Sequence, residues 1–183
     1  DKHSFKLLAG YSFQQFTESG FDAANENFPS DALTYNALGT GLYNRLLGVG
    51  GIGSYKNSSR LIAFFGRLNY DLNDKYYLSA SLRREGSSKF GLFNKWGNFP
   101  AVAVAWRLER ESFLKNVTWL DQLKLRADYG ETGNQDFGNY LSLDTYSGYG
   151  YYMFDSVTYQ VWGPSQNTNY DLRWEKAQNF NVG

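Results

Sequence analysis

The fold class can be inferred from the stretch RLIAFFGRLNYDLNDKYYLSASLRRE, residues 60–85. Over 60–72 every second residue from Ile62 to Leu72 is apolar or glycine, and the other parity ends in the polar residues Arg67, Asn69 and Asp71. The alternation continues over 76–85. This alternation is typical of β-strands that present one apolar and one polar face. The polar residues at 73–75 predict a tight turn between the two runs. The stretch therefore predicts an antiparallel hairpin whose two faces differ in polarity.

The same alternation recurs in four further stretches, so the sequence predicts six strands. Most of them are longer than the five or six residues usual in globular proteins. One segment, Glu109–Leu120, has helical spacing of its apolar residues and predicts a short amphipathic helix. The six expected strands cover His3–Gln15, Arg60–Leu72, Tyr76–Glu85, Ala101–Leu108, Leu123–Gly130 and Trp174–Val182.

The connections between these strands alternate between short and long. Asp71–Lys75 is a tight turn, and the stretch near Glu109–Trp119 is a short link, whereas Phe16–Ser59, Gly86–Gly97 and Glu131–Tyr170 are long. In an up-and-down antiparallel sheet every second connection lies at the same end. Short turns at one end and long loops at the other are typical of outer-membrane barrels. The strand lengths also suit a tilted strand that crosses a bilayer, which needs about 9–11 residues.

We therefore expect an all-β fold, a transmembrane antiparallel up-and-down β-barrel with long extracellular loops. Six strands are fewer than the eight of the smallest bacterial barrels. Residues 1–183 are accordingly expected to be a fragment of a barrel wall. The alternative from the same pattern is a soluble β-sandwich, in which the apolar face of each strand packs against a partner sheet.

Composition excludes several classes of protein. Eighteen basic and 18 acidic side chains cancel, which argues against a nucleic-acid binder that neutralises phosphates. Five Trp, 15 Tyr and 14 Phe are too many aromatic residues for a disordered chain. The chain has no Cys and only one His, His3, so we expect no metal site, no cofactor and no catalytic triad.

Two sets of residues are candidates for particular positions in a barrel wall, one facing the lumen and one at the membrane interfaces. Polar side chains on the predicted wet face could line a solute path or form a ladder of cross-strand ion pairs. Aromatic residues near strand ends suit the girdles at the membrane interfaces. The candidate lumen-facing residues are Arg67, Asn69, Arg83, Glu85, Lys124, Arg126 and Asp128. The candidate interface aromatics are Tyr76, Trp106, Trp119 and Trp174.

The third long connection is rich in aromatic residues and glycine. Aromatic rings pack against the apolar faces of sugars, and tyrosine-rich loops also suit protein recognition. A substrate and a partner protein are therefore both open as contacts of this loop, and the rings could also fold the loop on itself. The candidate contact residues are Tyr149, Tyr151, Tyr152, Tyr159 and Trp162.

Several stretches resemble one family in order and spacing, the SusC/RagA-type TonB-linked outer-membrane transporters (TonB-dependent receptors) of Bacteroidetes. The resemblance covers nearly the whole chain. Its motifs are LSASLRREGSSKFG at 78–91, KWGNFP at 95–100 with AWR at 105–107, WLDQLKLRADYGETGNQ at 119–135, NYDLRWEK at 169–176, and FPSDAL at 28–33.

The resemblance implies a barrel of about 22 strands plugged by a separate domain that this chain does not include. It also implies an outer-membrane location among lipid, a SusD-like surface lipoprotein as lid, and energy from TonB through the plug. The implied activity is nutrient uptake, the import of glycans and other oligosaccharides or of peptides. The alternatives are a secreted carbohydrate-binding β-sandwich module and an outer-membrane adhesin.

Overall fold

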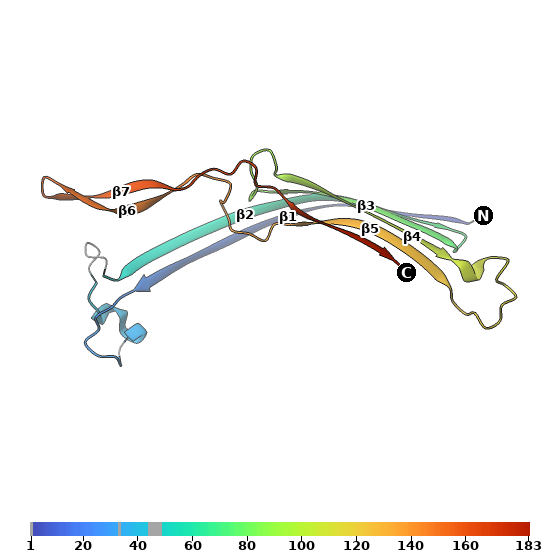
Figure 1. Ribbon diagram of the computed structural model, residues 1–183, viewed down its shortest axis with the longest axis horizontal. Helices are drawn as coiled ribbons and strands as arrows, with labels where there is room; N and C mark the ends of the chain where they lie inside the picture. Colours follow the sequence, from blue (N-terminus) through green and yellow to red (C-terminus); the bar gives the residue numbers. More distant parts are fainter. Residues whose placement is uncertain (1, 33, 44–48) are drawn as a thin grey trace. The chain divides into compact units, whose positions relative to one another are not determined.

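The computed structural model describes residues 2–32, 34–43 and 49–183, so Leu33 of the FPSDAL motif lies outside the described residues. Its main element is a six-stranded sheet in the order β1–β2–β3–β4–β5–β8, and strands β6 and β7 form a second, two-stranded sheet (Figure 1). The strands are β1 His3–Ala24, β2 Gly51–Leu72, β3 Tyr76–Ser87, β4 Trp96–Arg107, β5 Lys124–Asn134, β6 Thr145–Phe154, β7 Val157–Gln166 and β8 Glu175–Val182.

The all-β, antiparallel up-and-down architecture is confirmed. Each of the six expected strands is present, and each pairs with its neighbour in the expected order. The chain divides into two compact units. The first unit comprises residues 1–15, 60–143 and 168–183, and the second comprises residues 16–59 and 144–167.

Strands β1 and β2 are longer than the alternation predicts, at 22 residues each. Their additional residues, 16–24 and 51–59, belong to the second unit. There the Tyr55 ring lies over Gly20, and an added Cβ on Gly53 would meet the Asp22 carboxylate at 2.5 Å. Polar groups and glycine on a strand weaken the period-two signal, which depends on one apolar face. Backbone pairing extends past the point where that signal ends.

The helix expected at Glu109–Leu120 is wrong. The structure has a single 3-10 turn, Leu108–Arg110, followed by irregular turns. Backbone hydrogen bonds step by three residues, from Glu111 N to Leu108 O and from Leu114 N to Glu111 O. A helix of that length is marginal in water unless packing covers its apolar face, and Phe113 is 66% exposed.

No helix among the described residues is both long enough and apolar enough to cross a membrane.

The β6–β7 hairpin lies inside the connection that was expected to be a loop. Phe154 pairs with Val157 across a two-residue turn. Asp155 and Ser156 in that turn have φ values of +49° and +62°. Positive φ at both central positions is typical of a type I′ turn, whose twist matches that of a hairpin. The sequence lacks the usual glycine in this turn, and the hairpin was therefore missed.

The register of β2 to β5 separates two faces of the sheet. On one face, Tyr70, Leu78, Val104 and Ala127 lie in one row across the four strands. Adjacent rows on this apolar face contain Leu68, Ala80, Val102 and Tyr129, and Leu72, Tyr76, Trp106 and Leu125. The opposite, polar face contains Asn69, Ser79, Ala103 and Asp128 in one row, and Asp71, Tyr77, Ala105 and Arg126 in the next.

The apolar face is largely uncovered within the described part of the first unit. Val102 is 45% exposed, Val104 is 47% exposed and Phe180 on β8 is 70% exposed. A soluble sandwich would cover these side chains with a second sheet. The exposure favours a sheet whose apolar face contacts lipid, and the six strands form an open section of a barrel wall.

A small aromatic cluster lies where the long connections of the first unit meet the sheet. Phe90, Phe99 and Trp174 are its buried members, and Trp174 is only 8% exposed. The Trp174 ring lies 4.5 Å from the Phe90 ring and 5.2 Å from the Phe99 ring, and its Nε1 donates to Lys95 O at 3.1 Å. The girdle position expected for Trp174 is therefore corrected, because its ring is buried among aromatic neighbours.

Candidate functional site

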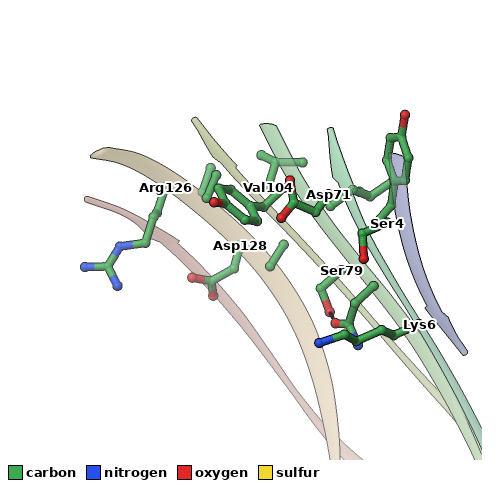
Figure 2. A pocket seen from close by; sticks show the side chains of 14 residues that line it. Ser4, Lys6, Asp71, Ser79, Val104, Arg126 and Asp128 are labelled. Carbon is green, nitrogen blue, oxygen red and sulfur yellow. Dashed lines mark hydrogen bonds between the residues drawn. The ribbon is translucent and has the colours of Figure 1, made fainter. Parts of the chain in front are cut away.

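A hollow of about 370 Å³ opens on the polar face of the first unit (Figure 2). Its floor is low because β3 and β4 present short side chains there, Ser79, Ala103 and Ala105. Longer polar side chains from the neighbouring strands stand around this floor. They are Ser4 and Lys6 on β1, Asn69 and Asp71 on β2, Tyr77 on β3, and Arg126 and Asp128 on β5.

A hydrogen-bond network fixes one side of the hollow. Arg67 Nε donates to Asn69 Oδ1 and to Ser79 Oγ, both at 3.2 Å. Ser79 Oγ in turn donates to Asn69 Oδ1 at 2.9 Å. Each contact is exposed or half-buried, where a hydrogen bond contributes about 0.5–1.5 kcal/mol. Their main effect is to orient Asn69 toward the hollow.

The hollow contains charges of both signs. Lys6 and Arg126 supply cations, and Asp71 and Asp128 supply carboxylates. None of the ion pairs between described residues includes any of these four side chains. Asp128 Oδ2 instead accepts a 2.9 Å hydrogen bond from Asn181 Nδ2 of β8, and Asp71 Oδ1 accepts one from the Asp74 backbone N–H. The surface can thus bind a polar, uncharged or zwitterionic partner through several separate contacts.

All seven sequence-predicted lumen residues lie on strands of this sheet, and three of them, Asn69, Arg126 and Asp128, line the hollow. The other four are not lining residues, although Arg67 bonds two residues that are. Arg83 pairs with Glu85 two residues along β3, and Lys124 Nζ lies 5.1 Å from the centre of the Tyr77 ring. The sequence candidates did not include five other polar residues of the hollow, although each lies on the polar parity of its strand. These residues are Ser4, Lys6, Asp71, Tyr77 and Ser79.

At the end with the short connections, three donors converge on the Glu111 carboxylate. The Tyr76 hydroxyl donates to Oε1 at 2.6 Å and Trp106 Nε1 donates to the same oxygen at 3.1 Å, while Lys75 Nζ lies 3.1 Å from Oε2. Hydrogen bonds from Tyr76, then Trp106 and Lys75, lower the pKa of Glu111 to about 2. The Tyr76 and Trp106 rings also stack, 6.2 Å apart.

The predicted interface aromatics therefore separate into different positions. Tyr76 and Trp106 are paired neighbours at the strand ends of the apolar face. Trp119 lies in the connection after β4 and is 81% exposed, so it is not part of the strand row. Trp96 was not among the candidates, yet its ring lies over Gly86 at the opposite end of the apolar face, where it stacks 6.3 Å from Phe64.

In the second unit, the β6–β7 hairpin sorts its aromatic side chains onto two faces. Tyr152 pairs with Tyr159, and the neighbouring pair on the same face is Phe154 with Val157. The Tyr152 ring lies 6.3 Å from Phe154 and 6.4 Å from Tyr159, so this face is almost entirely apolar. We call it the aromatic face of the hairpin.

The opposite face of the hairpin is mixed in character. Tyr151 pairs with Gln160, and the Gln160 amide lies over Gly148, the residue opposite Trp162. Trp162 is 63% exposed. Tyr149 is held within the hairpin, because its ring lies over Gly163 and its hydroxyl donates to Pro164 O. Rings beside an amide suit a ligand that has apolar surfaces and hydrogen-bonding groups.

Comparisons with known proteins give consistent matches over the whole chain. The family model "TonB dependent receptor-like, beta-barrel" matches residues 2–183. The chain is 35% identical to "TonB-dependent receptor P39" of Formosa agariphila and covers 17% of that protein with 100% of its own length. It is 34% identical to "TonB-dependent receptor SusC" of Bacteroides thetaiotaomicron, with 99% of the chain and 17% of that protein covered.

Solved structures agree with these sequence matches. The chain is similar to the "RagAB peptide transporter" with a TM-score of 0.80 and 27% identity, over 100% of this chain and 19% of that one. It is also similar to the RagAB peptide importer in its "open-open" state, with a TM-score of 0.77 and 29% identity. The chain thus spans about a fifth of the length of the proteins that it matches.

Proposed function

Because the chain belongs to the TonB dependent receptor-like β-barrel family, we propose that it forms part of the wall of an outer-membrane, TonB-dependent active transporter. The full protein would import oligosaccharides or peptides with a SusD-like lipoprotein as lid. In this proposal the chain carries out no chemistry. It supplies a lipid-facing surface, a polar inner surface and a recognition hairpin.

The observation that carries the membrane location is the spacing of two aromatic groups on the apolar face. Tyr76 pairs with Trp106 at one end, and Gly86 pairs with Trp96 at the other. Tyr76 and Gly86 are ten positions apart along β3. Ten residues span about 33 Å of strand, and a tilt of about 40° reduces this to about 25 Å of height. A height of about 25 Å is that of the apolar band between the aromatic girdles of an outer-membrane barrel.

The polar-face hollow supports transport over adhesion as the role of the inner surface. An adhesin needs only its outer loops, whereas a transporter needs a wet inner surface that binds polar groups weakly and at several points. Lys6, Asn69, Arg126 and Asp128 supply such a surface around the floor at Ala103. The solute or a plug segment would contact these side chains as it passes.

We assign separate roles to the two faces of the hairpin. The aromatic face, with Tyr152 and Tyr159, suits the apolar core of a protein interface, where tyrosine is enriched. We propose that it contacts the lid lipoprotein. The mixed face, with Tyr151 and Trp162 beside Gln160, suits the substrate, because sugar rings and peptides combine apolar surface with hydrogen-bonding groups.

Uptake by the intact bacterium tests this function. A strain that lacks the full-length gene is given two fluorescent mixtures, one of oligosaccharides and one of oligopeptides. It should lose uptake of at least one of them. Restoration of the gene should restore uptake, and a proton uncoupler should abolish it, since the energy comes from the inner membrane. Normal uptake of both mixtures, together with lost adhesion to surfaces, would assign the protein to the adhesins instead.

A further inference from the structure

The two ends of the apolar face differ in how their cations are paired. At the end with the short connections, Lys75 pairs with Glu111 at 3.1 Å and Arg110 pairs with Asp74 at 3.3 Å. At the end with the long connections, Arg84 on β3 has no carboxylate partner among the described residues. Arg60 on β2 shares the parity of Ile62 and Phe64, and it also has no carboxylate partner among the described residues.

Arg84 is held on the lipid side of the sheet by aromatic rings. Its guanidinium lies 5.3 Å from the centre of the Trp96 ring. Trp96 stacks on Phe64, and Phe64 in turn lies 5.2 Å from Tyr11. Arg84 pairs with Phe64 on β2 and with Asn98 on β4, so these side chains occupy one row across the wall. A cation–π contact orients the guanidinium but leaves its hydrogen-bond donors free for an anion.

An apolar hollow of about 550 Å³ begins one row below Arg84 on the same face. Gly66, Leu82 and Pro100 form the first row, and Leu82 is two residues from Arg84, about 6.6 Å along the strand. An added Cβ at Gly66 would meet nothing closer than Leu8 O at 3.9 Å, so the space above this glycine is open. The lining apolar side chains include Leu7, Leu68, Leu82, Val102 and Tyr129.

We propose that Arg84 and this hollow form a binding site for one phosphate-bearing anionic lipid of the leaflet next to the long connections. The phosphate would bind the Arg84 guanidinium, and one acyl chain would occupy the hollow over Gly66. Arg60, four positions beyond Phe64 on β2 and about 13 Å further along the strand, would add positive charge toward the long connections. The charge and shape fit this occupant because a cation next to an apolar groove matches the two parts of such a lipid. The proposal rests on the membrane location proposed above.

Native mass spectrometry of the full-length receptor tests the site. The purified receptor is titrated with dioleoylphosphatidylglycerol or with dioleoylphosphatidylcholine, which share acyl chains and differ in net charge. We expect the wild type to retain the anionic lipid preferentially. Arg84→Gln should weaken phosphatidylglycerol binding about fivefold and leave phosphatidylcholine unchanged, because one cation near an anionic headgroup has about that effect.

Two further variants test the hollow and serve as the control. Gly66→Leu should fill the open space and reduce retention of both lipids. Arg173→Gln, in an exposed arginine that pairs with Asp171, should change neither lipid. Unchanged lipid retention in both Arg84→Gln and Gly66→Leu would overturn the proposal. A receptor dimer that is lost in Gly66→Leu would also overturn it, because a second copy of the receptor would then occupy the hollow. A wild-type receptor that supports normal uptake but shows no lipid preference would overturn only this inference. A wild-type receptor that does not assemble in the membrane would overturn the proposed function.

Discussion

The Tyr76 hydroxyl donates a 2.6 Å hydrogen bond to Glu111 Oε1, which joins the start of β3 to the connection that follows β4. Trp106 donates to the same oxygen, so one carboxylate holds both rings of the proposed girdle at this end. Glu111 is not on a strand and was not a candidate in the sequence. Its position shows that the connection after β4 orients Tyr76 and Trp106, the two rings that we propose to lie at the membrane interface.

Replacing this carboxylate should destabilise the barrel in a pH-dependent way. The pKa of Glu111 in the folded chain is about 2, below its ordinary value of 4.5. The ionised form therefore favours the folded state above about pH 4.5, and this contribution is lost as the pH falls toward about 2. Glu111→Gln should lower the Tm of the detergent-solubilised receptor at neutral pH.

The difference in Tm between wild type and Glu111→Gln should narrow as the pH is lowered through the acid range. Asp121→Asn, a substitution in the same connection, serves as the control and should leave the Tm unchanged. A Tm difference that stays constant at every pH would show that the carboxylate charge does not act as described.

Glycine at 133 is required by the aromatic cluster. An added Cβ would meet Phe99 Cζ at 2.3 Å and a Trp174 ring atom at 2.9 Å. Both rings are buried, so they cannot move aside freely, and Gly133→Ala should cost about 1–3 kcal/mol of unfolding free energy. At Gly130 on the same strand the nearest atom is Ala101 Cβ at 3.4 Å, so Gly130→Ala should be nearly neutral. Equal effects in denaturant titrations of the two variants would contradict the packing described.

Two tryptophans that look alike in the sequence should differ in their effect on stability. Trp174 is buried, and Trp174→Ala should cost about 3–5 kcal/mol, the usual range for a large aromatic side chain in a core. Trp119 is 81% exposed, and Trp119→Ala should change the unfolding free energy by less than about 0.5 kcal/mol. Acrylamide quenching should give the same order, with Trp119 more accessible than Trp174. If Trp174 is quenched as readily as Trp119, the burial described here is wrong and the expected position of Trp174 at the membrane interface is restored.

The two faces of the β6–β7 hairpin should separate lid binding from substrate binding. Tyr152→Ala with Tyr159→Ala should weaken binding of the lid lipoprotein about 30-fold or more, as expected for two aromatic residues at the centre of an interface. Tyr151→Ala with Trp162→Ala should instead lower substrate affinity. Calorimetry with the purified lid and with the substrate measures both. The assignment fails if both double variants affect the same partner, or neither partner.

The period-two pattern was sufficient to predict the sheet and its two faces, because apolar residues recur at every second position over much of 60–85 and the register follows from the tight turn at 73–75. The pattern fails where no single face is apolar. The extensions of β1 and β2, the hairpin turn at Asp155 and the turns after Arg110 depend on backbone pairing and local contacts that leave no periodic signal. The burial of Trp174 depends on Phe90 and Phe99, which are distant in sequence and meet only in the folded chain.

Single-cysteine labelling of β4 tests whether the wall has one face in lipid and one in water, and it is practicable because this chain contains no cysteine of its own. Spin labels at 101, 102, 103 and 104, introduced one at a time into the reconstituted receptor after removal of any other cysteines, report contact with lipid or water. We predict that the labels at 102 and 104 collide with oxygen in the lipid phase, whereas those at 101 and 103 collide with a water-soluble nickel complex. Equal access of the nickel complex to all four positions would contradict a wall with one face in lipid.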